Sequence, residues 1–182
     1  MFRSRFVQIR NFSVSSTLRN DIYIAAAVRT PIGKFQGSFK GISATKLGSI
    51  AAKAAIERSG IPASEFDEVI FGNVISAGIG QAPARQVVFG AGLGEKVEAT
   101  TINKVCASGL KTVSLAAQAI KAGDSNVVLA GGMENMSDIP FYFPRGLVYG
   151  NPQAKDGILE DGLMDVYDNI HMGKLIYIYI YI

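Results

Sequence analysis

Short apolar runs alternate with helix-like stretches from residue 21 to residue 132, and this alternation limits the possible folds more than any other feature. Runs of the buried-strand type lie at 22–28, 68–75, 101–105 and 127–132. Helix-like stretches separate them, at 43–60, 83–90 and 107–123. A strand, a helix and a further strand at this spacing imply crossover connections, which make consecutive strands parallel. We therefore expect an α/β domain with a mostly parallel sheet and helices on both faces.

The expected helices carry their own start and stop signals. Ser43 is a good N-cap residue, and Gly60 is suited to the left-handed position that ends a helix. Pro83 is a favourable first residue of the second helix, and Gly123 closes the third. These signals predict three helices of ordinary length.

Charge and composition exclude several classes of function. The formal charge of +3 is concentrated in the first twenty residues, which hold Arg3, Arg5, Arg10 and Arg19 and no acidic residue. The remainder is slightly acidic, so it offers no basic face to nucleic acid. The longest uncharged apolar run has eight residues, far short of the roughly 20 needed to span a bilayer as a helix. A single cysteine excludes a disulfide scaffold. We expect neither a nucleic-acid partner nor a membrane partner.

Residues 1–19 are predicted to be a mitochondrial transit peptide. Phe2, Phe6 and Ile9 share one face of a helix, and the segment is rich in arginine and serine and lacks acids. A secretory signal would instead carry a continuous apolar stretch. The mature chain would then start near Asn20 in the mitochondrial matrix. A basic tail with no targeting role is the alternative.

The strand–helix rhythm stops after Pro140. Residues 140–174 are rich in proline, glycine and acids, as in the long functional loops of compact domains. Residues 175–182 form a low-complexity Tyr-Ile tail, which we interpret as a translated simple repeat at the end of a gene model. The expected organisation is an α/β domain over 20–139, an irregular region over 140–174 and the tail over 175–182.

Cys106 is the strongest candidate for a reactive group. It lies between an expected strand and an expected helix, in the sequence NKVCASGLKT. A thiol at a helix N-terminus is favoured as the thiolate by the helix dipole and by unpaired N–H groups. The small residues 107–109 leave room for a substrate. A buried, inert cysteine is an equally good interpretation of the position alone.

Five segments together resemble the thiolase family, in the order in which the family has them. They are RTPIGKFQGSF (29–39), GQAPARQ (80–86), NKVCASGLKT (103–112), GGMENMS (131–137) and DGLMDVYDNIHMG (161–173). The resemblance covers residues 21–174 and is strongest to the mitochondrial members that interconvert acetyl-CoA and acetoacetyl-CoA. It implies a thiolase-like N-terminal half, with residues 140–174 as the start of the family's loop domain.

The resemblance also implies roles for individual residues. Cys106 would be the catalytic nucleophile that takes an acyl group from acyl-CoA as a thioester, and its backbone N–H would help to hold the oxyanion. Leu163, His171 and Met172 would line the substrate pocket. GGMENMS would bring backbone close behind the cysteine through its glycines, with no reactive group. Coenzyme A thioesters would be the substrates, with no cofactor and no metal site in this chain, and a monovalent cation bound by family members would have its site elsewhere. Full-length members would form homo-oligomers, dimers or tetramers.

The sequence differs from the family in length. A complete thiolase has a second α/β half, which supplies an activating histidine, an asparagine and a second cysteine that acts as acid and base. This sequence has one cysteine and one histidine in total. Claisen condensation needs a base as well as an oxyanion hole, so we expect no turnover by this chain alone. A β-ketoacyl-synthase-type condensing enzyme and a non-catalytic half-length interaction protein remain the alternatives.

Overall fold

The computed structural model describes residues 21–146 and 149–174. Three parallel strands form its sheet, β1 (Glu68–Gly72), β2 (Glu98–Ile102) and β3 (Val128–Gly132), in the order β2-β1-β3. The ladders run from Glu68 opposite Glu98 to Gly72 opposite Ile102, and from Glu68 opposite Val128 to Gly72 opposite Gly132. The strands therefore end at one level, and the segments that follow them meet at one edge of the sheet.

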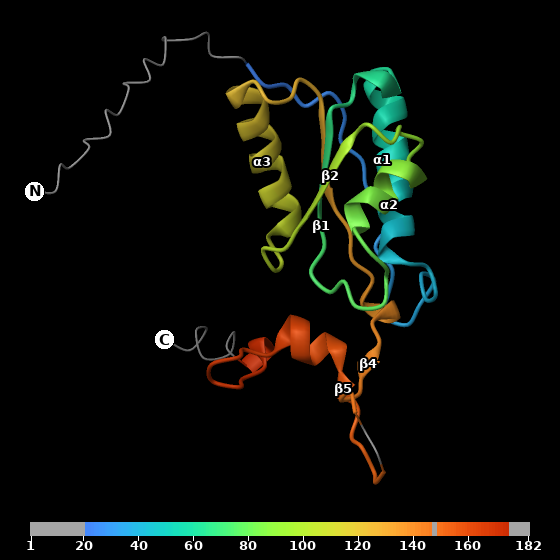
Figure 1. The fold of residues 1–182 in the computed structure, drawn as a ribbon, viewed down its shortest axis with the longest axis vertical. Helices are drawn as coiled ribbons and strands as arrows, with labels where there is room; N and C mark the ends of the chain where they lie inside the picture. The colour runs from blue at the N-terminus through green and yellow to red at the C-terminus, as the bar shows by residue number, and fades with distance from the viewer. Residues whose placement is uncertain (1–20, 147–148, 175–182) are drawn as a thin grey trace, which may run out of the picture.

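Helices cover both faces of this sheet. α1 (Ala44–Ser59) and α2 (Pro83–Gly90) lie on one face and α3 (Ser108–Ala122) lies on the other (Figure 1). The expected caps are present. The Ser43 side chain accepts a hydrogen bond from the Lys46 backbone N–H, and Gly60 and Gly123 adopt the left-handed conformation. The α/β class with helices on both faces is confirmed.

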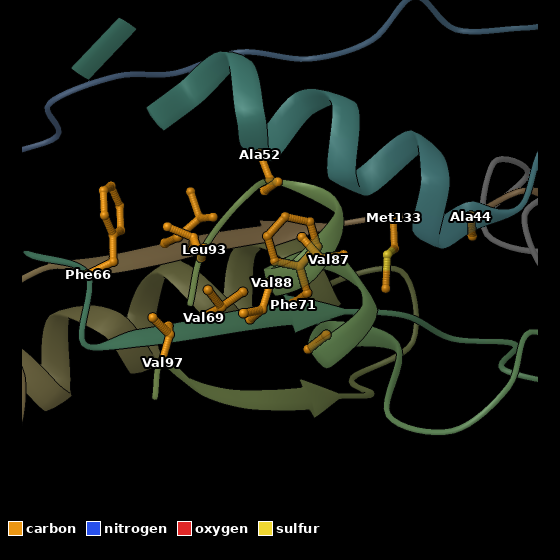
Figure 2. Packing of buried hydrophobic residues seen from close by; sticks show 13 residues of the cluster. Ala44, Ala52, Phe66, Val69, Phe71, Val87, Val88, Leu93, Val97 and Met133 are labelled. Atoms are coloured by element: carbon orange, nitrogen blue, oxygen red, sulfur yellow. The ribbon is translucent and has the colours of Figure 1, made fainter. Parts of the chain in front are cut away.

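The main hydrophobic core lies between the sheet and the pair α1–α2. Figure 2 shows Phe71 of β1 and Val87 of α2 packed beneath Ala52 of α1. α1 and α2 approach closely because Gly90 has no side chain; a Cβ there would collide with the Ser49 hydroxyl. By contrast, α3 buries small or polar residues on the sheet and leaves Leu110 exposed.

The expected strand at 22–28 is not formed. Residues 22–30 adopt no regular secondary structure and have no ladder partner among the described residues. With β3, α1 and α3 they line a groove of about 690 Å³. A buried strand requires a neighbouring edge to pair with as well as apolar side chains, and this segment does not pair with β3.

Two other strands differ in their bounds from the expectation. β1 ends at Gly72 instead of residue 75, because the Glu134 carboxylate accepts the backbone N–H groups of Val74 and Ile75. β2 covers Glu98–Ile102 instead of 101–105, because the residues after Ile102 form a turn held by the Asn103 side chain. Side chains at the strand ends thus replace ladder hydrogen bonds.

The segment after β3 forms small irregular elements at the carboxyl end of the sheet (Figure 1). β4 (Phe141–Tyr142) and β5 (Lys155–Asp156) pair antiparallel, and a short π-helical turn spans Leu159–Leu163. The expected change of architecture after Pro140 is therefore present. The transit peptide expected over 1–19 and the tail over 175–182 lie outside the described residues.

Candidate active site

Cys106 lies at the edge of the sheet where the strands end. It follows β2 by four residues and precedes α3 by two, and its side chain is exposed. With segments that follow β1 and β3 it lines a cavity of about 380 Å³. The carboxyl edge of a parallel sheet is a usual place for a binding site in α/β proteins.

Three glycines let the first turn of α3 approach the strands closely. A Cβ at Gly72 would lie 2.7 Å from the carbonyl carbon of Ser108, and one at Gly132 would lie 3.1 Å from the Cα of Gly109. Thr112 strengthens this contact by donating a hydrogen bond to the Gly131 carbonyl (3.0 Å). Of the two GGMENMS glycines, Gly132 thus lies against the first turn of α3, whereas a Cβ at Gly131 would meet the Phe71 ring.

The connection from β2 to α3 is tightly hydrogen-bonded. Val105 has φ 49°, and its N–H donates to Asn103 Oδ1 (2.8 Å). Its carbonyl accepts from both the N–H (3.0 Å) and the hydroxyl (2.6 Å) of Ser108. The Cys106 N–H donates to none of the described residues. A free N–H beside an exposed thiol can stabilise negative charge on a bound carbonyl oxygen.

Glu134 and Asn73 form the polar wall of the cavity. Glu134 Oε2 accepts from the Val74 N–H (2.8 Å), while Oε1 accepts from Asn73 Nδ2 (3.0 Å) and the Ile75 N–H (3.3 Å). Burial raises the pKa of Glu134, and these three donors act in the opposite direction. Because the carboxylate oxygens already accept these hydrogen bonds, Glu134 organises the wall and is poorly placed as a base for the thiol.

The expected pocket residues are only partly brought together. Leu163 lines the same cavity as Cys106. His171 and Met172 are not among its lining residues. His171 Nδ1 instead accepts from the Gly173 N–H (3.0 Å), and Met172 is 37% exposed. Among the described residues, Cys106 and Glu134 are thus the only titratable side chains on the cavity wall.

The described part of the chain contains no cluster of three or more metal-ligating side chains. Within the same residues, no helix is long and apolar enough to cross a membrane.

The sequence reasoning missed Asn73, Asn103 and Glu134. Each of them follows a strand end directly or at the second position, which was the available signal. Because parallel strands end at one edge, polar residues just after them are expected to meet there.

Comparison with known proteins gives consistent matches. The family described as "Thiolase, N-terminal domain" matches residues 22–176. An acetyl-CoA acetyltransferase of Yarrowia lipolytica is 63% identical over 155 residues, and the mitochondrial acetyl-CoA acetyltransferase A of Xenopus laevis is 57% identical over 166. These matches cover 85% and 91% of this chain and 39% of each relative.

A solved structure agrees with these relatives. The crystal structure of a thiolase from Ascaris suum in complex with coenzyme A superposes with a TM-score of 0.82 at 43% identity. The match covers 86% of this chain and 42% of that protein, so this chain spans about two fifths of the length of its relatives. The fold, the five motifs and these matches agree, and the chain belongs to the thiolase family.

Proposed function

We propose that this chain carries the acyl-accepting cysteine of an acetyl-CoA C-acetyltransferase. The observation that carries the proposal is the position of Cys106, exposed before α3 on the wall of a cavity, with a backbone N–H that donates to none of the described residues. The names of the relatives support acetyl-CoA as the substrate. The bound coenzyme A of the Ascaris suum thiolase supports a coenzyme A thioester in the same role here.

The chemistry assigned to the site is acyl transfer followed by carbon–carbon bond formation. The Cys106 thiolate attacks the carbonyl carbon of acetyl-CoA, and the Cys106 N–H stabilises the oxyanion. Coenzyme A leaves as its thiolate and takes up a proton, which leaves an acetyl-cysteine. The enolate of a second acetyl-CoA then attacks this thioester, releasing acetoacetyl-CoA and the cysteine thiolate. The reverse sequence cleaves acetoacetyl-CoA.

The second step needs a base that removes a proton from the second acetyl-CoA. No free base lines the described cavity, since Glu134 is held by its own donors. The 182-residue chain should therefore form the acetyl-cysteine slowly and should not turn over.

Intact-mass analysis tests this proposal. The full chain incubated with acetyl-CoA should gain one acetyl group, and Cys106→Ala should gain none. Cys106→Ala conserves the fold in this test because the side chain is exposed. Acetylation spread over lysines, or retained in the alanine variant, would overturn the assignment.

We also propose that Leu163, His171 and Met172 belong to the substrate-binding region, with Leu163 against the acyl group. Its position on the Cys106 cavity supports this role. Leu163→Trp should slow acetylation of Cys106, whereas Leu159→Trp, on the exposed part of the same turn, should not. Equal rates in the two variants would exclude Leu163 from the pocket.

We propose residues 1–19 as a matrix-targeting segment, residues 20–139 as the α/β domain and residues 140–174 as the start of a loop domain. The mitochondrial names of several relatives support the location. Residues 1–19 should carry a fused reporter into mitochondria, and Arg3→Glu with Arg10→Glu should abolish import. The corresponding lysine variants should still be imported. A reporter that stays in the cytosol would contradict the targeting role of residues 1–19.

We propose homo-oligomerisation of the full-length protein as a dimer or tetramer. The support, besides the family, is that β2 forms an edge of the described sheet. Light scattering of the full-length protein would decide the question, and a monomer at all concentrations would contradict it.

A further inference from the structure

Val105, the residue before Cys106, has a backbone conformation that valine rarely adopts. Its φ is 49°, in the left-handed region, where a β-branched residue is strained. Such strain persists only where surrounding contacts hold the residue in place. Side-chain packing does not supply those contacts, because Val105 is 52% exposed.

Hydrogen bonds on both sides of the residue hold Val105 instead. Its N–H donates to Asn103 Oδ1 (2.8 Å). Its carbonyl accepts from Ser108, through the N–H and the hydroxyl. The Ser108 hydroxyl also accepts from the Lys104 N–H (2.8 Å), so the turn is closed around Val105.

Asn103 is itself held by the neighbouring strand end. Its Nδ2 donates to the Val74 carbonyl (3.1 Å), and the Val74 N–H donates to Glu134 Oε2 (2.8 Å). Glu134, after β3, thus holds Val74, after β1, and Val74 in turn holds Asn103, after β2. This series of hydrogen bonds ends at Val105, the residue before Cys106.

We propose that Asn103 is a positioning residue for Cys106, holding Val105 in the left-handed conformation that turns the Cys106 thiol and N–H toward the cavity. This inference rests on the proposed role of Cys106 as the acyl acceptor. Without the Asn103 side chain, Val105 relaxes to negative φ and rotates the Cys106 peptide group. The N–H then leaves the position in which it can hold an oxyanion.

The test compares acylation of Cys106 by acetyl-CoA with alkylation by iodoacetamide in the full chain. Asn103→Ala should slow acylation by roughly three- to tenfold, the factor that corresponds to one hydrogen bond. Adding Val105→Gly to Asn103→Ala should restore most of the rate, because glycine adopts positive φ without strain. The matched control is Asn126→Ala, which removes an exposed asparagine at the opposite end of the sheet and should leave both rates unchanged.

The rescue separates positioning from general stability. In Val105→Gly the relief of backbone strain stabilises the folded state, and the greater freedom of the unfolded chain offsets it. The urea midpoint should therefore change little, so a restored rate without a restored midpoint supports positioning. An unchanged acylation rate in Asn103→Ala, or a double variant no faster than the single one, would overturn the inference.

The iodoacetamide arm keeps this inference separate from the proposed function. If wild-type Cys106 is alkylated but never acylated, the proposed function fails. In that case, slower alkylation in Asn103→Ala that recovers in the double variant supports the inference, and an unchanged alkylation rate contradicts it.

Discussion

Replacing Gly72 by alanine tests whether the position of Cys106 depends on close contact between β1 and α3. A Cβ at Gly72 would lie 2.7 Å from both the carbonyl carbon and the Cβ of Ser108, and 2.9 Å from the Gly109 nitrogen. Two of these atoms are backbone atoms of the first turn of α3, so they cannot rotate away. The start of the helix must move for the methyl group to fit.

The size of the effect follows from two opposing contributions. Inserting a methyl group into a packed contact costs about 1–3 kcal/mol. Replacing glycine by alanine offsets about 0.4–1 kcal/mol of this by restricting the unfolded chain. We expect a net destabilisation of roughly 1–2 kcal/mol. Gly94→Ala is the matched control, because nothing lies within 4 Å of its Cβ, and it should be neutral or slightly stabilising.

Urea denaturation followed by far-UV circular dichroism measures this difference. With a slope of about 2 kcal/mol per M, Gly72→Ala should lower the midpoint by roughly 0.5–1 M. Acylation of Cys106 should also slow, because the start of the helix that follows it has shifted. Equal midpoints for the two alanine variants would refute the reasoning, since they would mean that the contact with Ser108 is not formed.

The remaining predictions concern titration and exposed surface. Two backbone N–H groups just before β3 lower the pKa of Asp67. Asp67→Ala should therefore destabilise the fold most near neutral pH, and this destabilisation should disappear as the pH falls below about 3.8. A destabilisation independent of pH would contradict this. Burial raises the pKa of Glu134 above its usual 4.5. In urea titrations the stability of wild type relative to Glu134→Gln should therefore fall as the pH rises above 4.5, and a rise would contradict it. The hydrogen bond to Asp161 raises the pKa of Tyr142 to about 12, and Asp161→Asn should return it toward 10.0 in an ultraviolet titration; no movement would exclude the bond. Leu110 on α3 is 73% exposed, so the chain should increase the fluorescence of an apolar dye, and Leu110→Lys should reduce the increase; an unchanged signal would place the dye elsewhere.

The helices could be predicted from sequence because their signals are local. Ser43, Gly60 and Gly123 act through their own backbone conformation or a neighbouring N–H, and each is where the pattern placed it. β1 and β3 also followed, since their apolar runs are typical of strands covered on both faces, whereas β2 overlaps its expected range only at Thr101 and Ile102.

The ends of the strands could not be predicted from local patterns. Glu134 ends β1 from about sixty residues away along the chain. The apolar pattern at 68–75 does not indicate that contact. Residues 22–28 have the composition of a strand, but a strand depends on a partner edge, which an apolar run does not specify. At the site, the family motif identified Cys106, whereas the wall built by Asn73 and Glu134 depends on the register of three strands.

The central position of β1 has a consequence for how the molecule opens. Within residues 21–146 and 149–174, β1 pairs on both sides, whereas β2 and β3 each pair with it alone. Local unfolding should therefore begin at the outer strands. The Val74 and Val105 amides are held by groups that follow β3 and β2 respectively. Partial opening of either outer strand would therefore release one of these two amides while β1 stayed protected. In native-state hydrogen exchange, the edge that holds Cys106 would therefore lose its order in partial openings that leave the centre of the sheet intact.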